Sequence, residues 1–174
     1  MQEKKRALVI IDVQNDYFPE GKFPLWQAEE ALGHIEQAIE KAQTLNIPIL
    51  LVQHIVEEDI PNMFFIKETH GVQIHPRLLT AVSNAPIITK HFTDSFFETQ
   101  LDATLQKLGI EELLICGMMT QNCVVFTALS KDAAKYEVSV LSDCCAAVSQ
   151  MVQQLTLGGL SLHFRVDTSD NILI

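Results

Sequence analysis

Three residues of the sequence could carry out chemistry together: Asp12, Lys90 and Cys123. Asp12 comes directly after the apolar run 7–11, Lys90 ends a second short run, and Cys123 follows a third by a short turn. A nucleophilic hydrolase combines such groups as a base, a cation and a nucleophile. If the three runs are parallel strands of one sheet, their carboxyl ends meet at one edge, where ligands bind. The sequence therefore predicts a cysteine-centred site at that edge.

Cys123 is predicted to lie in the first turn of a helix that Thr120 caps. Unpaired backbone N–H groups and the helix dipole favour negative charge there, so we expect a lowered thiol pKa and a nucleophilic sulfur. Backbone N–H groups of the turn that begins at Gly117 could form an oxyanion hole for acyl transfer. The alternative is that Cys123 is a small buried hydrophobe packed under the helix.

Asp12 strengthens the catalytic interpretation. A carboxylate at the end of an apolar strand is costly unless it is paired, and Lys90 and Cys123 are its candidate partners. A purely structural Asp12–Lys90 ion pair is the alternative, because such pairs also perturb pKa values. His91 is a weak candidate, since adjacent strand residues point to opposite faces of a sheet.

Short apolar runs alternate with helical patterns along the chain, and uninterrupted apolar runs suit strands of a parallel sheet covered on both faces. We expect strands at residues 6–11, 49–52, 86–89, 113–116, 138–141 and 163–166, helices at residues 27–45, 99–109, 120–135 and 149–157, and an irregular stretch at 54–85. The predicted fold class is α/β: a three-layer α/β/α sandwich with a mostly parallel sheet of about six strands. We expect residues 1–174 to form a single domain, with the irregular stretch serving as core, lid or subunit interface.

Three blocks of the chain resemble the isochorismatase-like cysteine hydrolases, the group that includes nicotinamidases and carbamoyl-amide hydrolases. The blocks are residues 8–18 (LVIIDVQNDYF), 87–90 (IITK) and 117–124 (GMMTQNCV). Residues 71–76 and 94–101 also look like the family, so the resemblance covers nearly the whole chain. It implies a Rossmann-like fold with the strand order 3-2-1-4-5-6. In that order two strand spacings, about 10 Å, separate the third strand from the first.

The resemblance also implies roles for individual residues. Asp12 would be the general base, Lys90 the cation that orients and polarises, and Cys123 the nucleophile. The backbone N–H groups of Met119 and Cys123 would form the oxyanion hole, and a cis peptide bond would join Met118 to Met119.

The implied reaction is hydrolysis of a small non-peptide C–N bond, in an amide or a carbamoyl or ureide group, through a thioester on Cys123. Metal-bearing nicotinamidases carry an Asp-x-His pattern after the second strand, whereas this chain has Gln53 and, of that set, only His54. We therefore expect no metal and no other cofactor, and a substrate other than nicotinamide. Two alternatives stay open: isochorismatase-type hydrolysis of a vinyl ether, which needs no thiol nucleophile, and a non-catalytic binding or scaffold member of the fold.

Side chains that follow the first and third strands could form the wall of a pocket for a small flat or apolar acyl group. We expect the substrate-binding residues to be Gln14, Tyr17, Trp26, Phe92 and Phe96. Plain packing is the alternative for the aromatic residues, and Trp26 could equally lie at a subunit contact.

Composition excludes several classes of protein. Lys and Arg number 12 against 22 Asp and Glu, and this net charge of −10 argues against a nucleic-acid or anionic-membrane partner. The apolar run 7–11 is too short for a membrane span or a signal-peptide core, so we expect a cytoplasmic protein. The four cysteines lack a CxxC spacing, which disfavours zinc and thioredoxin-like chemistry. The mean hydropathy of +0.17, with the habit of the family, suggests a homo-dimer or tetramer.

Overall fold

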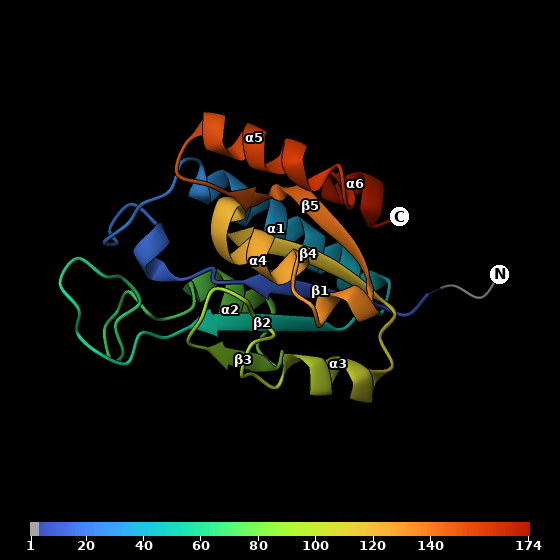
Figure 1. Ribbon diagram of the computed structural model, residues 1–174, viewed down its shortest axis with the longest axis horizontal. Helices are drawn as coiled ribbons and strands as arrows, with labels where there is room; N and C mark the ends of the chain where they lie inside the picture. Colours follow the sequence, from blue (N-terminus) through green and yellow to red (C-terminus); the bar gives the residue numbers. More distant parts are fainter. Residues whose placement is uncertain (1–3) are drawn as a thin grey trace.

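The computed structural model describes residues 4–174, which contain one six-stranded sheet (Figure 1). The strand order is β3-β2-β1-β4-β5-β6, and each neighbouring pair is parallel. The strands are β1 (Arg6–Ile11), β2 (Ile49–His54), β3 (Ile87–Lys90), β4 (Glu112–Met118), β5 (Glu137–Ala146) and β6 (Arg165–Asp167). This architecture confirms the predicted α/β class and the strand order that the resemblance implies.

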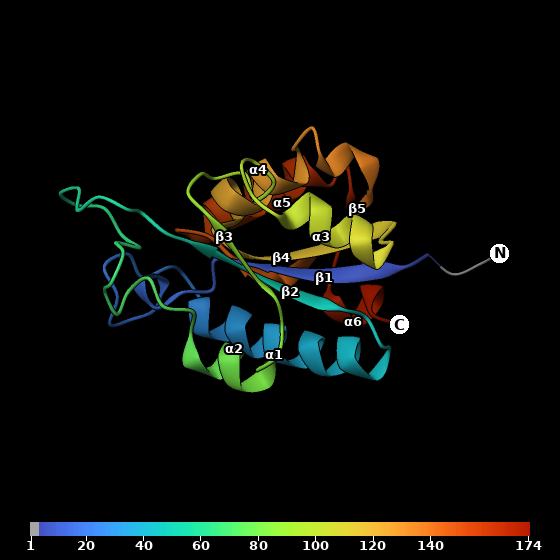
Figure 2. The same ribbon diagram turned by 90° about the horizontal axis from the view of Figure 1, so that it is seen from below.

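Helices cover both faces of the sheet (Figure 2). One face carries α1 (Ala28–Thr44), α2 (Pro76–Ala81) and α6 (Ser169–Ile172), and the other carries α3 (Leu101–Leu108), α4 (Val125–Ala128) and α5 (Gln150–Leu160). Three short turns complete the chain: the 3₁₀ turns η1 (Asn15–Tyr17) and η3 (Ala133–Lys135) and the π-helical turn η2 (Thr120–Val124).

The central strand β1 fixes where the site lies. Its residues 7–11 are fully buried, because β2 and β4 flank it and helices cover both of its faces. In the register, Ile11 lies opposite Val52 of β2 and Gly117 of β4. Residues that follow β1 therefore emerge in the middle of the carboxyl edge, on the side where the loops after β1 and β2 project (left in Figure 1).

The structure departs from the predicted elements in three places. The helix expected at residues 120–135 is divided into η2, α4 and η3. Strand β5 continues to Ala146, well beyond the predicted end at residue 141. The stretch expected to be irregular contains the short helix α2, which begins with Pro76 and at which the His75 ring accepts a hydrogen bond from the Arg77 N–H.

Among the described residues, no helix has both the length and the apolar character that crossing a bilayer requires.

Candidate active site

Asp12, Lys90 and Cys123 converge at the carboxyl edge of the sheet. Asp12 follows β1, Lys90 is the last residue of β3, and Cys123 lies in η2 just after β4. Lys90 Nζ lies 3.0 Å from Asp12 Oδ2, and the thiol of Cys123 is within 4.8 Å of the same carboxyl group. All three side chains are buried. The order of the strands puts β2 between Lys90 and Asp12, so the long side chain of Lys90 spans the end of that strand.

The backbone turns sharply at Asp12. Its φ of 51° is left-handed, a conformation that a short polar side chain tolerates better than most. The Asp12 N–H still donates to Val52 O at 3.0 Å, as a continuing strand would, and the Gln14 N–H donates to Asp12 O at 2.9 Å. The turn lets the chain leave the sheet while the Asp12 carboxylate stays buried beside Lys90 and Cys123.

Gly117 is required where β4 leads into the turn that holds Cys123. Its φ is +118°, and a Cβ built there would lie 2.0 Å from the backbone oxygen of Ile11. The next peptide bond but one, Met118–Met119, is cis, which is the geometry that the resemblance implies. The π-helical turn then begins, with the Val124 N–H donating to Met119 O at 3.2 Å.

The prediction that Thr120 caps this turn is wrong. Thr120 is the first residue of η2, and its hydroxyl donates to Gln153 Oε1 of α5 at 2.6 Å instead of accepting a backbone N–H. The side chain of Thr120 thus fastens the turn that holds Cys123 to the neighbouring helix.

Asp12 and Lys90 stabilise each other's ionised forms. Burial alone would raise the pKa of Asp12, but the Lys90 ammonium and His54 more than offset it, so the pKa lies below its ordinary value. Burial likewise favours neutral Lys90, but Asp12 and Cys123 raise its pKa above the ordinary value. Lys90 also donates to Thr93 O at 2.9 Å. The pair is therefore ionised at neutral pH.

The expected low pKa of Cys123 is wrong. Burial raises the pKa of this thiol, the Asp12 carboxylate raises it further, and the Lys90 ammonium compensates only in part. The largest effect on this pKa is the loss of solvent around the thiol, which the position of Cys123 near a helix terminus does not reveal. Cys123 is therefore a neutral thiol beside an ionised carboxylate.

His54 is a residue of the site that the sequence argument did not assign to catalysis. Its Nδ1 lies 3.7 Å from Asp12 Oδ2, and its side chain keeps 15% of its surface exposed, unlike the buried triad. Gln14 fixes its backbone in both directions, since the amide nitrogen donates to His54 O and the amide oxygen accepts from the His54 N–H, each at 2.8 Å. The signal in the sequence was its place at the end of the second strand; in the structure it is the register partner of Lys90.

One group of side chains in the described chain could offer ligands to a metal ion. Ligand atoms of Asp12, His54 and Cys123 lie within 4.8 Å of one another. The Lys90 ammonium, 3.0 Å from the same carboxylate, opposes a dication there. The donor set also lacks a second carboxylate at position 53, where the side chain is Gln53. The absence of a metal remains a prediction.

The five residues expected to line a substrate pocket lie at different places in the structure. Tyr17 lies near the triad, and burial, then the charge of Asp12, raise the pKa of its phenol, which stays protonated. Both N–H groups of the Gln14 amide are used, because its nitrogen also donates to Val72 O. In the structure Gln14 positions His54, and its contact with a substrate stays a prediction.

The other three aromatic side chains have different neighbours. Phe96 is buried and stacks on Tyr136, with 6.3 Å between the ring centroids, so it belongs to the core. Phe92 is exposed and packs edge-on against Phe97. Trp26 lines a separate 260 Å³ cavity between α1, β5 and α5. None of these contacts places Phe96, Phe92 or Trp26 against the triad.

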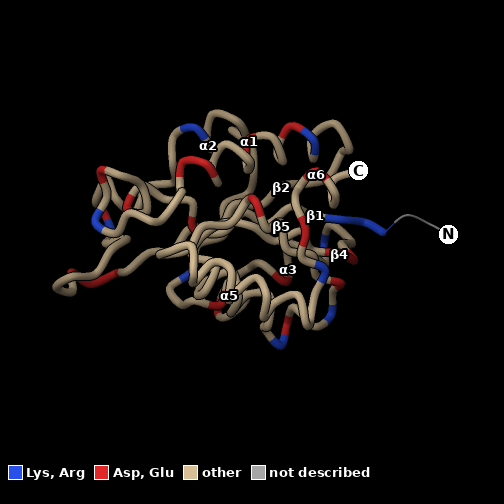
Figure 3. The backbone as a smooth tube through the Cα atoms, turned by 90° about the horizontal axis from the view of Figure 1, so that it is seen from above, with Lys and Arg blue, Asp and Glu red and all other residues tan. Residues whose placement is uncertain are grey.

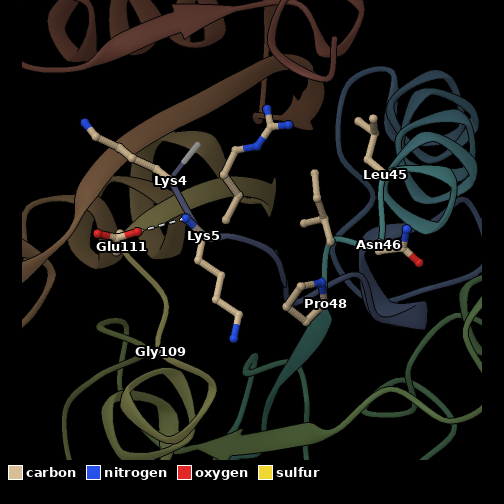
Figure 4. Close-up of a pocket in the computed structure, with 9 residues that line it drawn as sticks. Lys4, Lys5, Leu45, Asn46, Pro48, Gly109 and Glu111 are labelled. Carbon is tan, nitrogen blue, oxygen red and sulfur yellow. Dashed lines mark hydrogen bonds between the residues drawn. The ribbon is translucent and has the colours of Figure 1, made fainter. Parts of the chain in front are cut away.

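A cavity of 640 Å³ lies far from the triad, at the amino-terminal edge of the sheet (Figure 4). It is lined by Lys4, Lys5 and Glu111, and the Glu111 carboxylate accepts the Lys5 backbone N–H. The carboxy-terminal ends of α1 and α3 face it at Leu45 and Gly109. Cations stabilise helix carboxyl ends, which accounts for the lysines without a ligand.

The protein thus combines a three-layer α/β/α fold with a buried acid–cation–thiol arrangement. The model of the isochorismatase domain matches residues 6–169, and the chain belongs to the isochorismatase family. It is 35% identical over 158 residues to the isochorismatase family protein YddQ of Bacillus subtilis, covering 91% of this chain and 87% of that one. It is also 25% identical over 206 residues to the nicotinamidase of Escherichia coli, covering 93% and 96%.

Solved structures agree with this assignment. The crystal structure of a putative isochorismatase hydrolase from Oleispira antarctica superposes with a TM-score of 0.88 at 28% identity, covering 99% of this chain and 98% of the other. The protein is therefore an isochorismatase-family hydrolase.

Proposed function

We propose that the protein is a cysteine hydrolase that cleaves a small non-peptide C–N bond, in an amide or a carbamoyl or ureide group, through a thioester on Cys123. One observation carries the proposal: the buried ion pair of Asp12 and Lys90, 3.0 Å between Oδ2 and Nζ, stands beside the Cys123 thiol. A neutral thiol next to an ionised carboxylate is a nucleophile with its base in place.

In the first half-reaction Asp12 takes the thiol proton, and the Cys123 sulfur adds to the carbonyl carbon. The C–N bond then breaks as the nitrogen takes the proton from Asp12, which leaves a thioester. In the second half-reaction Asp12 takes a proton from water, and the hydroxide adds to the thioester carbon. The C–S bond breaks, and Asp12 returns the proton to the sulfur.

Lys90 and the nucleophile turn assist both half-reactions. The ammonium group of Lys90 stays charged and balances the negative charge that moves between the carboxylate and the sulfur. We assign the oxyanion hole to the backbone N–H groups of Met119 and Cys123, next to the cis peptide bond. Fixed donors of this kind stabilise the charge that develops on the substrate oxygen.

The kind of substrate follows from the enclosure of the site. A fully buried triad suits a small molecule, and a family relative named as a nicotinamidase acts on an amide. Gln53 occupies the place where the metal-bearing nicotinamidases have a carboxylate, so we propose a reaction without a metal and a substrate other than nicotinamide.

Release of ammonia from a panel of small carboxamides and ureides tests the proposal, with Cys123→Ala beside the wild type. We expect turnover by the wild type and none by the variant, and a covalent adduct of acyl mass on Cys123 in acid-quenched samples. Ammonia release that survives Cys123→Ala would overturn the thioester on Cys123, and no turnover of any member by the wild type would favour one of the two alternatives, hydrolysis of a vinyl ether or a non-catalytic member of the fold.

The cellular compartment, the binding partner, the domain organisation and the oligomeric state of the protein are also proposals. All four cysteines are free and buried, which suits the reducing cytoplasm. The net charge of −10 supports a small molecule rather than a nucleic acid as the partner. We propose that residues 1–174 act as one domain and that the chain assembles into a homo-dimer or tetramer.

A further inference from the structure

Helix α5 has the reverse of the usual polarity, with a polar side chain buried and apolar side chains exposed. A helix on the surface of a protein normally turns its apolar residues inward and its polar residues to water. In α5 the buried side chain near the middle of the helix is Gln153, which accepts from Thr120 and donates to Cys145 O at 3.0 Å. The apolar side chains of Met151 and Leu155 point outward and are 70% and 71% exposed.

The helix also lacks charge. Asp143 and Arg165 flank a run of 21 residues without Asp, Glu, Lys or Arg, in a chain that is 20% charged (Figure 3). A solvated helix of a protein with a net charge of −10 would be expected to carry charged side chains on its outer face. The composition of α5 is that of a helix covered on both sides.

Helix α4 lies on the same face of the sheet as α5 (Figure 2), and it too carries exposed apolar side chains. The Thr120–Gln153 hydrogen bond joins α5 to η2, and the Thr127–Ser95 hydrogen bond joins α4 to the loop after β3. We define the α4/α5 face by six side chains that are about half exposed or more: Phe92, Phe97, Phe126, Leu129, Met151 and Leu155.

The size of this face matches an interface. At about half of the 150–250 Å² that an aromatic side chain offers, each of these residues exposes on the order of 100 Å². Together they expose roughly 600 Å², about three quarters of the roughly 800 Å² per partner that a standard protein–protein interface buries. An apolar surface of this size is at the upper end of what a monomer exposes, and such surfaces often mark interaction sites.

We infer that the α4/α5 face is the contact surface between two copies of this chain. Two molecules that each carry a charge of −10 repel each other except where their surfaces are uncharged. A two-fold axis through this face lays α5 of one copy against α5 of the other, so that Met151 and Leu155 meet their own counterparts. A basic partner would require acidic side chains on α5, and the helix has none.

The contact would also reach the catalytic residues. The α5 helix holds the Cys123 turn through Gln153 and Thr120, and Phe92 and Phe97 follow Lys90 in the chain. Association of two copies therefore holds in place the segments that carry Cys123 and Lys90. This last consequence, unlike the interface itself, rests on the proposed function.

Measurement of mass in solution by light scattering and sedimentation velocity tests the interface without any substrate. The wild type is expected at a multiple of the 19.5 kDa chain mass. In the double variant Met151→Glu, Leu155→Glu the mass is expected to fall to half or less, with the dissociation constant raised about thirtyfold or more. Leu79→Glu on α2 is the matched control, an exposed apolar residue on the opposite side of the sheet, and it should keep the wild-type mass.

A second measurement does not depend on a destabilising charge. Because the native cysteines are buried, Leu155→Cys supplies an exposed thiol, and a short bis-maleimide is expected to join two such chains covalently. Leu79→Cys should not be joined. A monomeric wild type, an unchanged mass of the double variant, or equal cross-linking of the two cysteine variants would overturn the proposal, whether or not the protein hydrolyses an amide.

Discussion

Lys90 Nζ lies 3.0 Å from Asp12 Oδ2 even though strand β2 separates their two strands. The distance across two strands is about 10 Å, and two features of the structure remove it. Lys90 is the last residue of β3, so its side chain can run over the end of β2, and Asp12 has already turned out of β1. The ion pair therefore depends on the long lysine side chain as well as on the sheet.

The ion pair should be needed for both stability and turnover. Asp12→Asn leaves a buried ammonium without a counter-charge, and Lys90→Met leaves a buried carboxylate, so each should lower the free energy of unfolding by about 3 kcal/mol. The double variant, with neither charge, should recover most of that loss. Each of the three variants should lose turnover by about 10² to 10⁴-fold. Urea denaturation and steady-state kinetics measure the two effects; recovery of turnover in the double variant would show a purely structural pair.

The pH profile should be flat across neutrality. The pKa of Asp12 is lowered, so the base is ionised above its ordinary value of about 3.9, and its contribution to stability is lost only as pH falls through the lowered value. The pKa of Lys90 is raised, so its contribution is present below about 10.4 and lost as pH rises through the raised value. Both kcat/KM and the free energy of unfolding should therefore change little from about pH 5 to 9 as far as this pair controls them.

The reactivity of the Cys123 thiol should likewise show no titration near neutral pH. Because burial raises the pKa of Cys123, its alkylation by iodoacetamide should be slow at neutral pH and should still be rising at pH 9. A limb of kcat/KM or of alkylation centred between pH 6 and 8 would contradict the assignment of Asp12 as the base.

The sequence predicts the sheet well because buried parallel strands have a local signature. The run at residues 6–11 forms β1 with the predicted bounds, since every side chain from Ala7 to Ile11 must be apolar when both faces are covered. The convergence of Asp12, Lys90 and Cys123 follows from the order of the strands. Both features can be predicted from the fold class and the positions of the strand ends alone.

Features that depend on tertiary surroundings were missed or were wrong. The spacing of apolar residues does not distinguish a regular helix from the π-helical turn at Thr120–Val124, which forms where Thr120 bonds to α5. The pKa of Cys123 is set by burial, which no local motif records. His54 acquires its place beside Asp12 through the hydrogen bonds of Gln14, a residue that was expected to contact substrate.

Gly117 should tolerate no side chain. In Gly117→Ala the added Cβ meets the Ile11 backbone oxygen at 2.0 Å, and the φ of +118° is strained for any residue with a Cβ. We expect a loss of at least about 2 kcal/mol of unfolding free energy and of most turnover, because the nucleophile turn must shift. Gly33→Ala in α1 is the control: its Cβ would meet nothing within 4 Å, and the variant should be more stable by up to about 1 kcal/mol. Thermal unfolding distinguishes the two, and equal stability would show that β4 can move away from β1.

Asp16 should hold the loop after β2 against the active site. The two oxygens of this buried carboxylate accept the N–H groups of Lys22 at 3.0 Å and of Phe65 at 2.7 Å. Phe65 in turn packs edge-on against Tyr17, with 4.6 Å between the ring centroids. In Asp16→Asn one acceptor becomes a donor and faces an N–H group, which should cost about 1–3 kcal/mol.

Loss of this anchor should be local. Amide hydrogen exchange of the variant should quicken in residues 55–75, which Phe65 attaches to the site, while β1 and β4 keep their protection. Because the triad itself is intact, KM should rise more than kcat falls. Asp59→Asn, on the exposed part of the same loop, is the matched control and should leave exchange and kinetics unchanged. If Asp16→Asn exchanged faster throughout the sheet, the carboxylate would be a support of the whole fold rather than an anchor of the loop.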